Sequence, residues 1–407
     1  MSDPWLCPPT QAQRDRALAL AARAGHTPQA GEDLATFWQR IPVADAVDHR
    51  STVGTGDPAS GARIFFSSGG STGTQRYTLL RFSEVLDNSA IHGRGYAACG
   101  IGPDHVVATW GLPGIMSSEF TVYVALAATG ACIVPIGDTA PDLIIQLVRD
   151  FGATTLLVMP SDLTPIMTRL EQTGEQLDAI RLVVTGGEPL FPADTQRFRA
   201  RLGASVEFRS VFQTSDNGTI GYQCQACGFG EYHVHDDLQL VEIVASGPDG
   251  TGDLVTTSLV RELVPALRLR TGDRAVPVTG TCPCGRASPR IRLTGRAGRY
   301  VKFGGEKLDL ESLISLKEKL GVTIDDFQAI LERDELGRDR FVLHSNRVFG
   351  DPRLQELSTS LFAELGRKLA SQLDHGIVGR LAFAPLMPGE AWTSANGKTQ
   401  FFADRRG

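Results

Sequence analysis

The sequence predicts a large N-terminal α/β domain with mostly parallel sheets and a β-rich subdomain, followed by a small α+β C-terminal domain. Between residues 61 and 190, short apolar segments alternate with helix-like segments, a pattern typical of a buried parallel sheet. From Tyr232 onward, short strand-like segments separated by turns indicate the β-rich subdomain. After Arg299, strand-like and helix-like segments mix over about 110 residues, an ordinary domain size.

The individual elements follow from local composition and apolar spacing. Residues 11–24 are amphipathic and rich in helix formers, which predicts a helix. In the α/β part we expect strands at 62–66, 77–80, 105–110, 131–136, 155–159 and 182–185, and helices at 87–98, 121–128, 143–151 and 166–177. Further on we expect strands within 233–244 and 252–259 and at 300–303, 326–332, 340–344 and 380–385, with helices at 310–320 and 352–373.

Composition excludes several classes of protein. The 407 residues, 42% hydrophobic and 21% charged, fit two or three ordinary globular domains. A net charge of −6 without a long basic run argues against binding to nucleic acid or an anionic membrane. The N-terminus has no basic and apolar signal regions, so we expect a cytoplasmic protein. The stretch 120–137 approaches membrane-spanning length, but Gly130 and Pro135 interrupt it, which favours a buried helix followed by a strand.

A Ser/Gly-rich segment joins the two strands expected at 62–66 and 77–80. Its glycines allow positive φ and close backbone approach, and its backbone N–H groups could form a nest for phosphate oxygens. The candidate phosphate ligands are Ser67, Ser68, Gly69, Gly70, Ser71, Thr72, Gly73 and Arg76. The segment is not a Walker A loop, because it lacks the GK[ST] ending. The alternative is a flexible turn.

Two further signals are weak when each is taken alone. Asp273 follows a Gly turn in RTGD and could accept hydrogen bonds from ribose hydroxyls, although most such triplets are turns with an exposed Asp. Lys398 follows Asn396-Gly397, a turn signal that would present it on a loop. The alternative for Lys398 is an ordinary solvated lysine.

Four of the seven cysteines form two close pairs, Cys224/Cys227 and Cys282/Cys284. Without a secretory signal, such pairs favour metal binding over disulfides. Four thiolates complete a closed tetrahedral zinc site, which would be structural. His233 and His235 are additional candidate ligands, and the alternative is four free thiols. The other cysteines are Cys7, Cys99 and Cys132, of which we expect the last two to lie in the core.

The order and spacing of these motifs resemble the adenylate-forming superfamily of acyl-CoA and aryl-CoA synthetases, whose members bind AMP. The resemblance covers residues 37–398. Its motifs are the phosphate loop at 67–76, the adenine-side loop at 185–190, the aromatic–Gly–x–Thr–Glu slot at 211–218, the ribose motif at 267–273, the hinge region at 293–308 and the lysine loop at 396–398. The segment CPCGRASPRIRLTGR, residues 282–296, is most similar to the phenylacetate–CoA ligase branch.

This resemblance implies a role for each matching residue. Lys398 would touch both the substrate carboxylate and the α-phosphate, Arg296 the ribose or phosphate, and Asp273 the ribose hydroxyls. Asp216 stands where the family has Glu and would bind Mg²⁺. The remaining nucleotide-binding positions are Gly186, Gly187 and Glu188 beside the adenine, and Phe212, Gln213, Thr214 and Ser215.

The resemblance also implies a domain organisation, and the sequence departs from the family pattern at the hinge, in the segment after the hinge and at Gln213 and Arg76. Residues 1–297 would form the adenylation core, with the zinc-bearing β subdomain at about 222–295, and residues 299–407 a mobile lid. Gly298 would be the hinge, where the family has Asp or Lys, so rotation is kept and a polar interaction is lost. Gln213 replaces a Gly and would narrow the acid pocket, whereas Arg76 replaces a Lys and keeps its charge.

The implied function is activation of a small, aromatic carboxylic acid by ATP and Mg²⁺. Acyl-AMP and pyrophosphate form, and the acyl group then passes to a thiol, that of coenzyme A. Trp110, Phe212 and Ile220 are candidate walls of the acid pocket, with core packing as an equal alternative. A carrier protein, an amine or a reductase are alternative acceptors. A degenerate, non-catalytic nucleotide-binding homologue is a further alternative, against which the retained Asp273, Arg296 and Lys398 argue.

Overall fold

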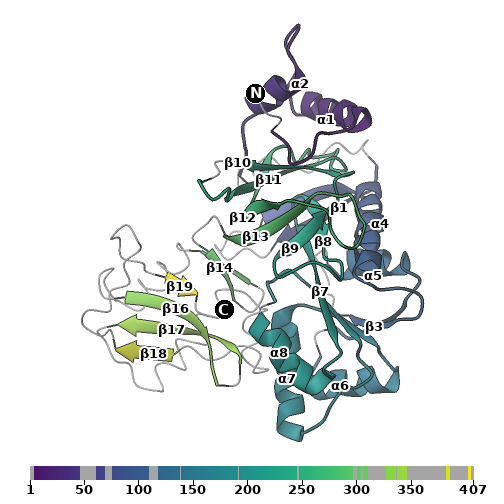
Figure 1. Cartoon of the computed structure of the whole chain (residues 1–407), viewed down its shortest axis with the longest axis vertical. Coiled ribbons are helices and arrows are strands. Elements are labelled where there is room, and N and C mark those ends of the chain that lie inside the picture. Colours follow the sequence, from purple (N-terminus) through teal and green to yellow (C-terminus); the bar gives the residue numbers. More distant parts are fainter. Residues whose placement is uncertain are drawn as a thin grey trace.

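The computed structural model describes the chain in thirteen ranges. These are residues 4–45, 61–68, 76–109, 118–137, 139–190, 192–244, 247–296, 300–303, 306–309, 327–335, 337–345, 382–385 and 402–404. An eleven-stranded sheet of order β10-β11-β12-β13-β9-β8-β7-β6-β5-β3-β4 runs through the larger part of the molecule (Figure 1).

One half of this sheet is parallel. It comprises β3 (Val106–Thr109), β4 (Cys132–Pro135), β5 (Thr155–Val158), β6 (Leu182–Gly186) and β7 (Glu207–Thr214). All four side chains of β5 are buried, as expected for a strand covered on both faces. The apolar runs in the sequence therefore mark β3 to β6, and the strands expected there agree within a few residues. No strand is expected at β7, because its sequence EFRSVFQT is not an apolar run.

Helices cover both faces of the parallel half. They are α4 (Phe82–Ala98), α5 (Ser118–Ala127), α6 (Pro141–Asp150), α7 (Pro160–Thr173) and α8 (Pro192–Leu202). Side chains of α6, α7 and α8 share one core cluster with the strands, and side chains of α4 and α5 share another. Residues 120–137 form the end of α5 and then β4, as expected, and no described helix has the length and apolar character needed to cross a membrane.

Helix boundaries differ from expectation where local capping decides. Helix α4 begins at Phe82, five residues earlier than expected, because the Glu84 carboxylate accepts the Arg81 backbone N–H at 2.5 Å. Helix α7 begins at Pro160, which occupies the first turn, where its missing N–H costs nothing. It ends at Thr173 because Gly174 takes the left-handed conformation, with φ +73°.

The other half of the large sheet is antiparallel. It contains β8 (Gly218–Tyr222), β9 (Glu231–Val234), β10 (Gln239–Val244), β11 (Gly252–Ser258), β12 (Leu269–Val278) and β13 (Arg290–Arg296). Strand β7 pairs in parallel with β6 and antiparallel with β8. The expected β-rich region is therefore confirmed as strands, but these strands continue the sheet of the α/β part.

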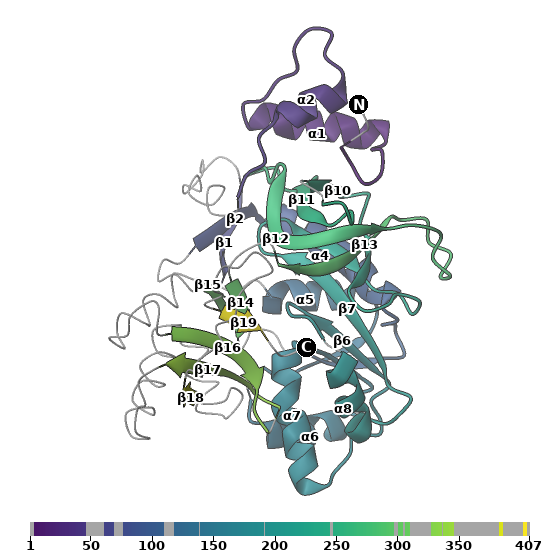
Figure 2. The same cartoon turned by 60° about the vertical axis from the view of Figure 1, so that its left-hand side comes forward.

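The N-terminal helices α1 (Gln11–Arg23) and α2 (Leu34–Arg40) lie at the end of the molecule beside β10 and β11 (Figure 2). A hydrophobic cluster that includes Trp38 and Leu240 joins them to the sheet. Beside this cluster the buried Arg268 forms an ion pair with Glu242 at 2.8 Å. The same guanidinium donates to the carbonyls of Trp38, Gln39 and Ile41 at the end of α2.

We expect Arg268→Met to destabilise the protein by about 3–5 kcal/mol, because Glu242 would remain as a buried, unpaired charge. The midpoint of denaturant unfolding measures this. Arg94→Met is the control, because Arg94 and Asp237 form an exposed ion pair, which is worth at most about 1 kcal/mol. If Arg268→Met behaved like Arg94→Met, the buried pair would not hold the N-terminal helices on the sheet.

Two smaller sheets complete the described chain. Strands β1 (Arg63–Ser68) and β2 (Arg76–Arg81) form an antiparallel hairpin in which Ser68 pairs with Arg76. Strands β14 (Tyr300–Phe303) and β15 (Glu306–Asp309) also pair antiparallel.

The C-terminal sheet has the order β18-β17-β16-β19. Its strands are β16 (Phe327–Arg333), β17 (Asp339–Ser345), β18 (Ala382–Pro385) and β19 (Phe402–Asp404). It lies beside α8 in Figure 1, and Arg333 forms an ion pair with Asp194 of that helix. The expected helices at 310–320 and 352–373 lie outside the described residues. The α/β and β-rich parts, with this smaller sheet, confirm the predicted fold class.

Candidate active site and metal centre

The candidate nucleotide site lies where the parallel half of the large sheet ends. In open α/β sheets, ligands bind outside the carboxyl ends of the parallel strands. Strand β6 ends at Gly186, which pairs with Val211 of β7, and the chain turns at Gly187 with φ +81°. A Cβ on Gly186 would lie 3.1 Å from the Val211 side chain. The expected adenine-side residues, Gly186 to Glu188, therefore lie beside the strand that carries Phe212.

A tight turn after β7 carries the expected magnesium ligand. Gly218 closes the turn with φ +76°, and a Cβ there would lie 2.3 Å from Asn88 Oδ1, so only glycine fits. The turn holds Asp216 with 5% of its surface exposed. Asp216 Oδ1 accepts a hydrogen bond from Thr78 Oγ1 of β2 at 3.0 Å. The structure thus joins this turn to the hairpin that carries the expected phosphate segment.

Asp273 lies in β12 directly after Gly272, whose φ is +79°. The Asp273 backbone N–H donates to Thr271 Oγ1 at 3.0 Å, and its backbone partner in β13 is Arg296. Asp273 is 6% exposed, so it is not the solvated turn residue of the alternative interpretation. The pairing brings two of the predicted nucleotide-binding residues side by side.

Tyr232 packs against the expected wall of the acid pocket. The Tyr232 ring packs against Phe212, with 5.6 Å between centroids, and its hydroxyl donates to Ser210 Oγ at 3.2 Å. Burial raises the pKa of Tyr232 to about 12, and the negative charge of Asp273 contributes in the same direction. Phe212 and Gln213 are half-buried. Ile220 has no exposed surface and packs as part of the core.

Several expected site residues lie outside the described residues. These are Gly69, Gly70, Ser71, Thr72, Gly73, Trp110, Gly298 and Lys398. For Ser67, Ser68, Arg76 and Arg296 the structure describes the strand to which each belongs and not the side chain. Their proposed roles, and the boundaries of the core and lid domains, remain predictions.

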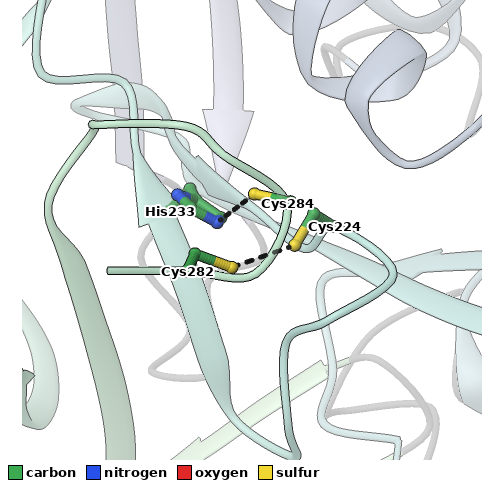
Figure 3. A group of neighbouring side chains, drawn as sticks. All are labelled: Cys224, His233, Cys282 and Cys284. Atoms are coloured by element: carbon green, nitrogen blue, oxygen red, sulfur yellow. Dashed lines mark hydrogen bonds between the residues drawn. The ribbon is translucent and has the colours of Figure 1, made fainter. Parts of the chain in front are cut away.

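The antiparallel half holds a compact cluster of metal-binding side chains (Figure 3). One ligand atom from each of Cys224, His233, Cys282 and Cys284 lies within 4.8 Å of all the others. The Cys224 and Cys282 Sγ atoms are 3.6 Å apart, and Cys284 Sγ is 3.4 Å from His233 Nε2. Tetrahedral coordination with Zn–S bonds of about 2.3 Å separates ligand atoms by about 3.8 Å. The cluster therefore fits a four-coordinate zinc ion.

This set differs by one ligand from the four cysteines expected. Cys227 Sγ lies 3.6 Å from Cys224 Sγ, yet Cys227 does not belong to the cluster, and His233 takes its place. The pairing of β9 with β13 brings His233 close to the loop that carries Cys282 and Cys284. Its Nδ1 lies 2.9 Å from Ser288 Oγ, a contact that orients Nε2 toward the cluster.

Cys284 and His233 have pKa shifts that favour the metal-binding form. By contrast, burial raises the pKa of the Cys224 and Cys282 thiols, so these two would lose their protons on binding a metal. Burial would raise the pKa of the Cys284 thiol, but hydrogen bonds from the Arg286 backbone and from Cys282 lower it to about 7. Burial lowers the pKa of His233, which keeps the imidazole neutral at neutral pH. Thiolate and neutral imidazole are the forms that bind zinc.

Cys99 and Cys132, which lie outside the metal-binding cluster, differ in burial. Cys99 is buried, as expected, and burial raises its pKa to about 12. The expectation that Cys132 lies in the core is wrong, because its side chain is exposed. Cys132 begins β4, the edge strand of the large sheet, and therefore has no neighbouring strand on one side to cover it.

Comparison with known proteins identifies the family. The family model described as "AMP-binding enzyme" matches residues 10–214, half of the chain. This chain belongs to the AMP-binding enzyme family. The match covers α1 through β7 and therefore includes the hairpin, the adenine-side loop and the strand that leads to Asp216. The expected membership of the adenylate-forming superfamily is confirmed.

Relatives of this AMP-binding enzyme support the expected branch. Phenylacetate–coenzyme A ligase of Thermus thermophilus is 23% identical over 85% of this chain and 81% of its own length. The Escherichia coli enzyme of the same name is 27% identical over 59% of this chain and 56% of its own length. The likeness to the phenylacetate–CoA ligase branch is confirmed.

A solved structure supports the fold. The structure of 2-hydroxyisobutyryl-CoA ligase in complex with 2-HIB-AMP and CoA superposes with a TM-score of 0.74 and 17% identity. The superposition covers 99% of this chain and 91% of that one.

Proposed function

We propose that this protein activates a small carboxylic acid with ATP and transfers the acyl group to coenzyme A. A carboxylate oxygen attacks the α-phosphorus of ATP, the bond to pyrophosphate breaks, and acyl-AMP forms. The thiolate of coenzyme A then attacks the acyl carbonyl, and AMP leaves. The family membership and the similarity to phenylacetate–coenzyme A ligases support this reaction.

The hydrogen bond between Thr78 and Asp216 is the observation that carries the proposal. It links the hairpin that bears the predicted phosphate segment to a buried carboxylate. A carboxylate oxygen is a ligand that Mg²⁺ prefers, and Asp216 would hold the ion beside the phosphates. The ion supplies charge neutralisation for the departing pyrophosphate.

The remaining residues of the proposed site position the two substrates. Asp273 would orient the ribose, and Gly186 to Glu188 would border the adenine. Lys398 would bring a positive charge to the carboxylate and α-phosphate, carried by the lid domain that begins after the Gly298 hinge. Closure of such a lid sheds water from an intermediate that hydrolyses easily.

An aromatic acid is the substrate class that we propose. The Phe212 ring is half-buried and packed against Tyr232, so it offers a fixed aromatic face beside the site. Gln213 is also half-buried and adds bulk where the family has glycine, which favours a small acid. Trp110 would complete the pocket wall.

We also propose that Cys224, His233, Cys282 and Cys284 bind a structural zinc ion. All four positions of a tetrahedral site are filled by protein ligands, so none is left for substrate. The ion would join the residues around β8 and β9 to the loop before β13, and hold the antiparallel half of the sheet together.

ATP–pyrophosphate exchange with a panel of aryl acids and matched aliphatic acids tests the first half-reaction. We expect acid-dependent exchange that is fastest with one aryl acid. Asp273→Ala should raise the KM for ATP more than it lowers kcat, because a ribose contact mostly positions the nucleotide. No exchange with any acid would contradict the proposal. A second assay with coenzyme A, carrier protein and amines identifies the acceptor.

A further inference from the structure

Arg261 is a buried arginine beneath the turn that carries Asp216. It follows β11, and only 4% of its surface is exposed. Its Nη2 donates to the Ser215 carbonyl at 3.4 Å and would lie 3.3 Å from a Cβ on Gly218. The guanidinium therefore contacts both ends of the turn from Ser215 to Gly218.

The Arg261 guanidinium forms few hydrogen bonds with the described residues around it. Within the described part of the chain, Arg261 Nε and Nη1 have no hydrogen-bond partner. A buried guanidinium with one long hydrogen bond is costly, because burial removes its hydration. Burial lowers the pKa of Arg261 to about 10, so it stays cationic at neutral pH. Arg268, by contrast, uses its guanidinium for an ion pair and three carbonyl contacts.

Two carboxylates attract Arg261, those of Glu84 and Asp216. Glu84 is already satisfied, because it accepts backbone N–H groups from Arg81, Glu262 and Leu263. These bonds tie the segment that carries Arg261 to the first turn of α4. Asp216 accepts the Thr78 hydroxyl and directly follows Ser215, whose carbonyl accepts a hydrogen bond from Arg261. The charge of Arg261 is thus directed at the turn and its carboxylate.

We propose that Arg261 is a positioning residue for the adenylation step, fixing the turn from Ser215 to Gly218 and thereby the carboxylate of Asp216. The inference rests on the proposed function, because it assigns Arg261 to that reaction. Arg261 does not touch substrate. It acts through Asp216, whose placement decides where the metal-bound phosphates sit.

The test compares substitutions of the buried Arg261 with substitution of an exposed arginine, Arg94. Arg261→Met should lower kcat for pyrophosphate exchange roughly 10²-fold, as misplacement of a reacting group by about 1 Å does, with a nearly unchanged KM for the acid. Arg94→Met, which removes an exposed ion pair with Asp237, should leave kcat unchanged. Arg261→Lys should recover part of the lost rate, because it keeps the positive charge. The recovery should be incomplete, because lysine lacks the planar guanidinium and its several N–H donors.

The outcomes separate this inference from the proposed function. Wild-type protein that exchanges pyrophosphate, together with Arg261→Met at the wild-type kcat, overturns the role of Arg261 and leaves the proposed function intact. A lower kcat in Arg261→Met that Arg261→Lys does not improve also overturns it, because the charge would then be irrelevant. If Arg261→Met fails to fold, Arg261→Gln, which also lacks the charge, takes its place. A wild-type kcat in Arg261→Gln overturns the role of Arg261, and a kcat below that of Arg261→Lys supports it.

Discussion

Replacing Lys398 by alanine should lower the rate of pyrophosphate exchange about 10²–10³-fold, the usual effect of removing one well-placed group from a charged transition state. Negative charge builds up between the carboxylate and the α-phosphate as they approach, and Lys398 is the predicted cation there. ATP affinity, measured by calorimetry, should change little, because phosphate and ribose contacts come from other segments.

Lys368→Ala is the matched control for this substitution. Lys368 lies in the same predicted lid, within the segment 352–373 expected to be a helix, and its replacement should have no effect on exchange. Equal rates for Lys398→Ala and wild type would remove Lys398 from the mechanism. Equal losses for both variants would indicate general damage to the lid and not a specific contact.

Cys284→Ser should release zinc and lower the melting temperature strongly, because an ion held only by the folded state adds its binding energy to folding. Protein purified without added metal should contain close to one equivalent of zinc, the stoichiometry of a single closed site. Exchange activity of the variant that stays folded should remain, since no zinc position faces substrate. Loss of activity without loss of stability would contradict a structural role.

Cys227→Ser distinguishes the two possible ligand sets. The cluster of Cys224, His233, Cys282 and Cys284 predicts that Cys227→Ser keeps its zinc, whereas His233→Ala loses it. The reverse result would show that the four cysteines bind the ion. Cys132→Ser, at the exposed edge of the sheet, controls for the effect of removing a thiol.

The sequence predicts strands β3 to β6 well because they are apolar runs, and it misses β7 because polar residues interrupt that strand. Helix α8 is also missed, because its eleven residues are rich in charge and, among its described side chains, Phe198 and Leu202 are those in the main core. The continuity of the large sheet could not be predicted either, since pairing of β7 with β8 depends on register and not on composition.

The candidate site likewise contains some residues that sequence motifs predict and others that only the folded structure reveals. Asp216 and Asp273 are found by motif, because each sits in a short segment of fixed spacing. The metal ligand His233 depends on the pairing of β9 with β13, which no local spacing encodes. Arg261 lies in none of the motifs, and the ribose motif gives no sign that its Arg268 is buried, because arginine is normally exposed and only the assembled fold reveals that both are buried.

The unit that sequence comparison detects differs from the unit that folds. The family match ends at residue 214, the last residue of β7, in the middle of the eleven-stranded sheet. A fragment of residues 10–214 would expose the whole of β7 as an unpaired edge, the type of surface that drives aggregation. It would also leave α2 without Arg268 and Glu242. Any excision of the nucleotide-binding part for crystallography or engineering must therefore extend at least through β13.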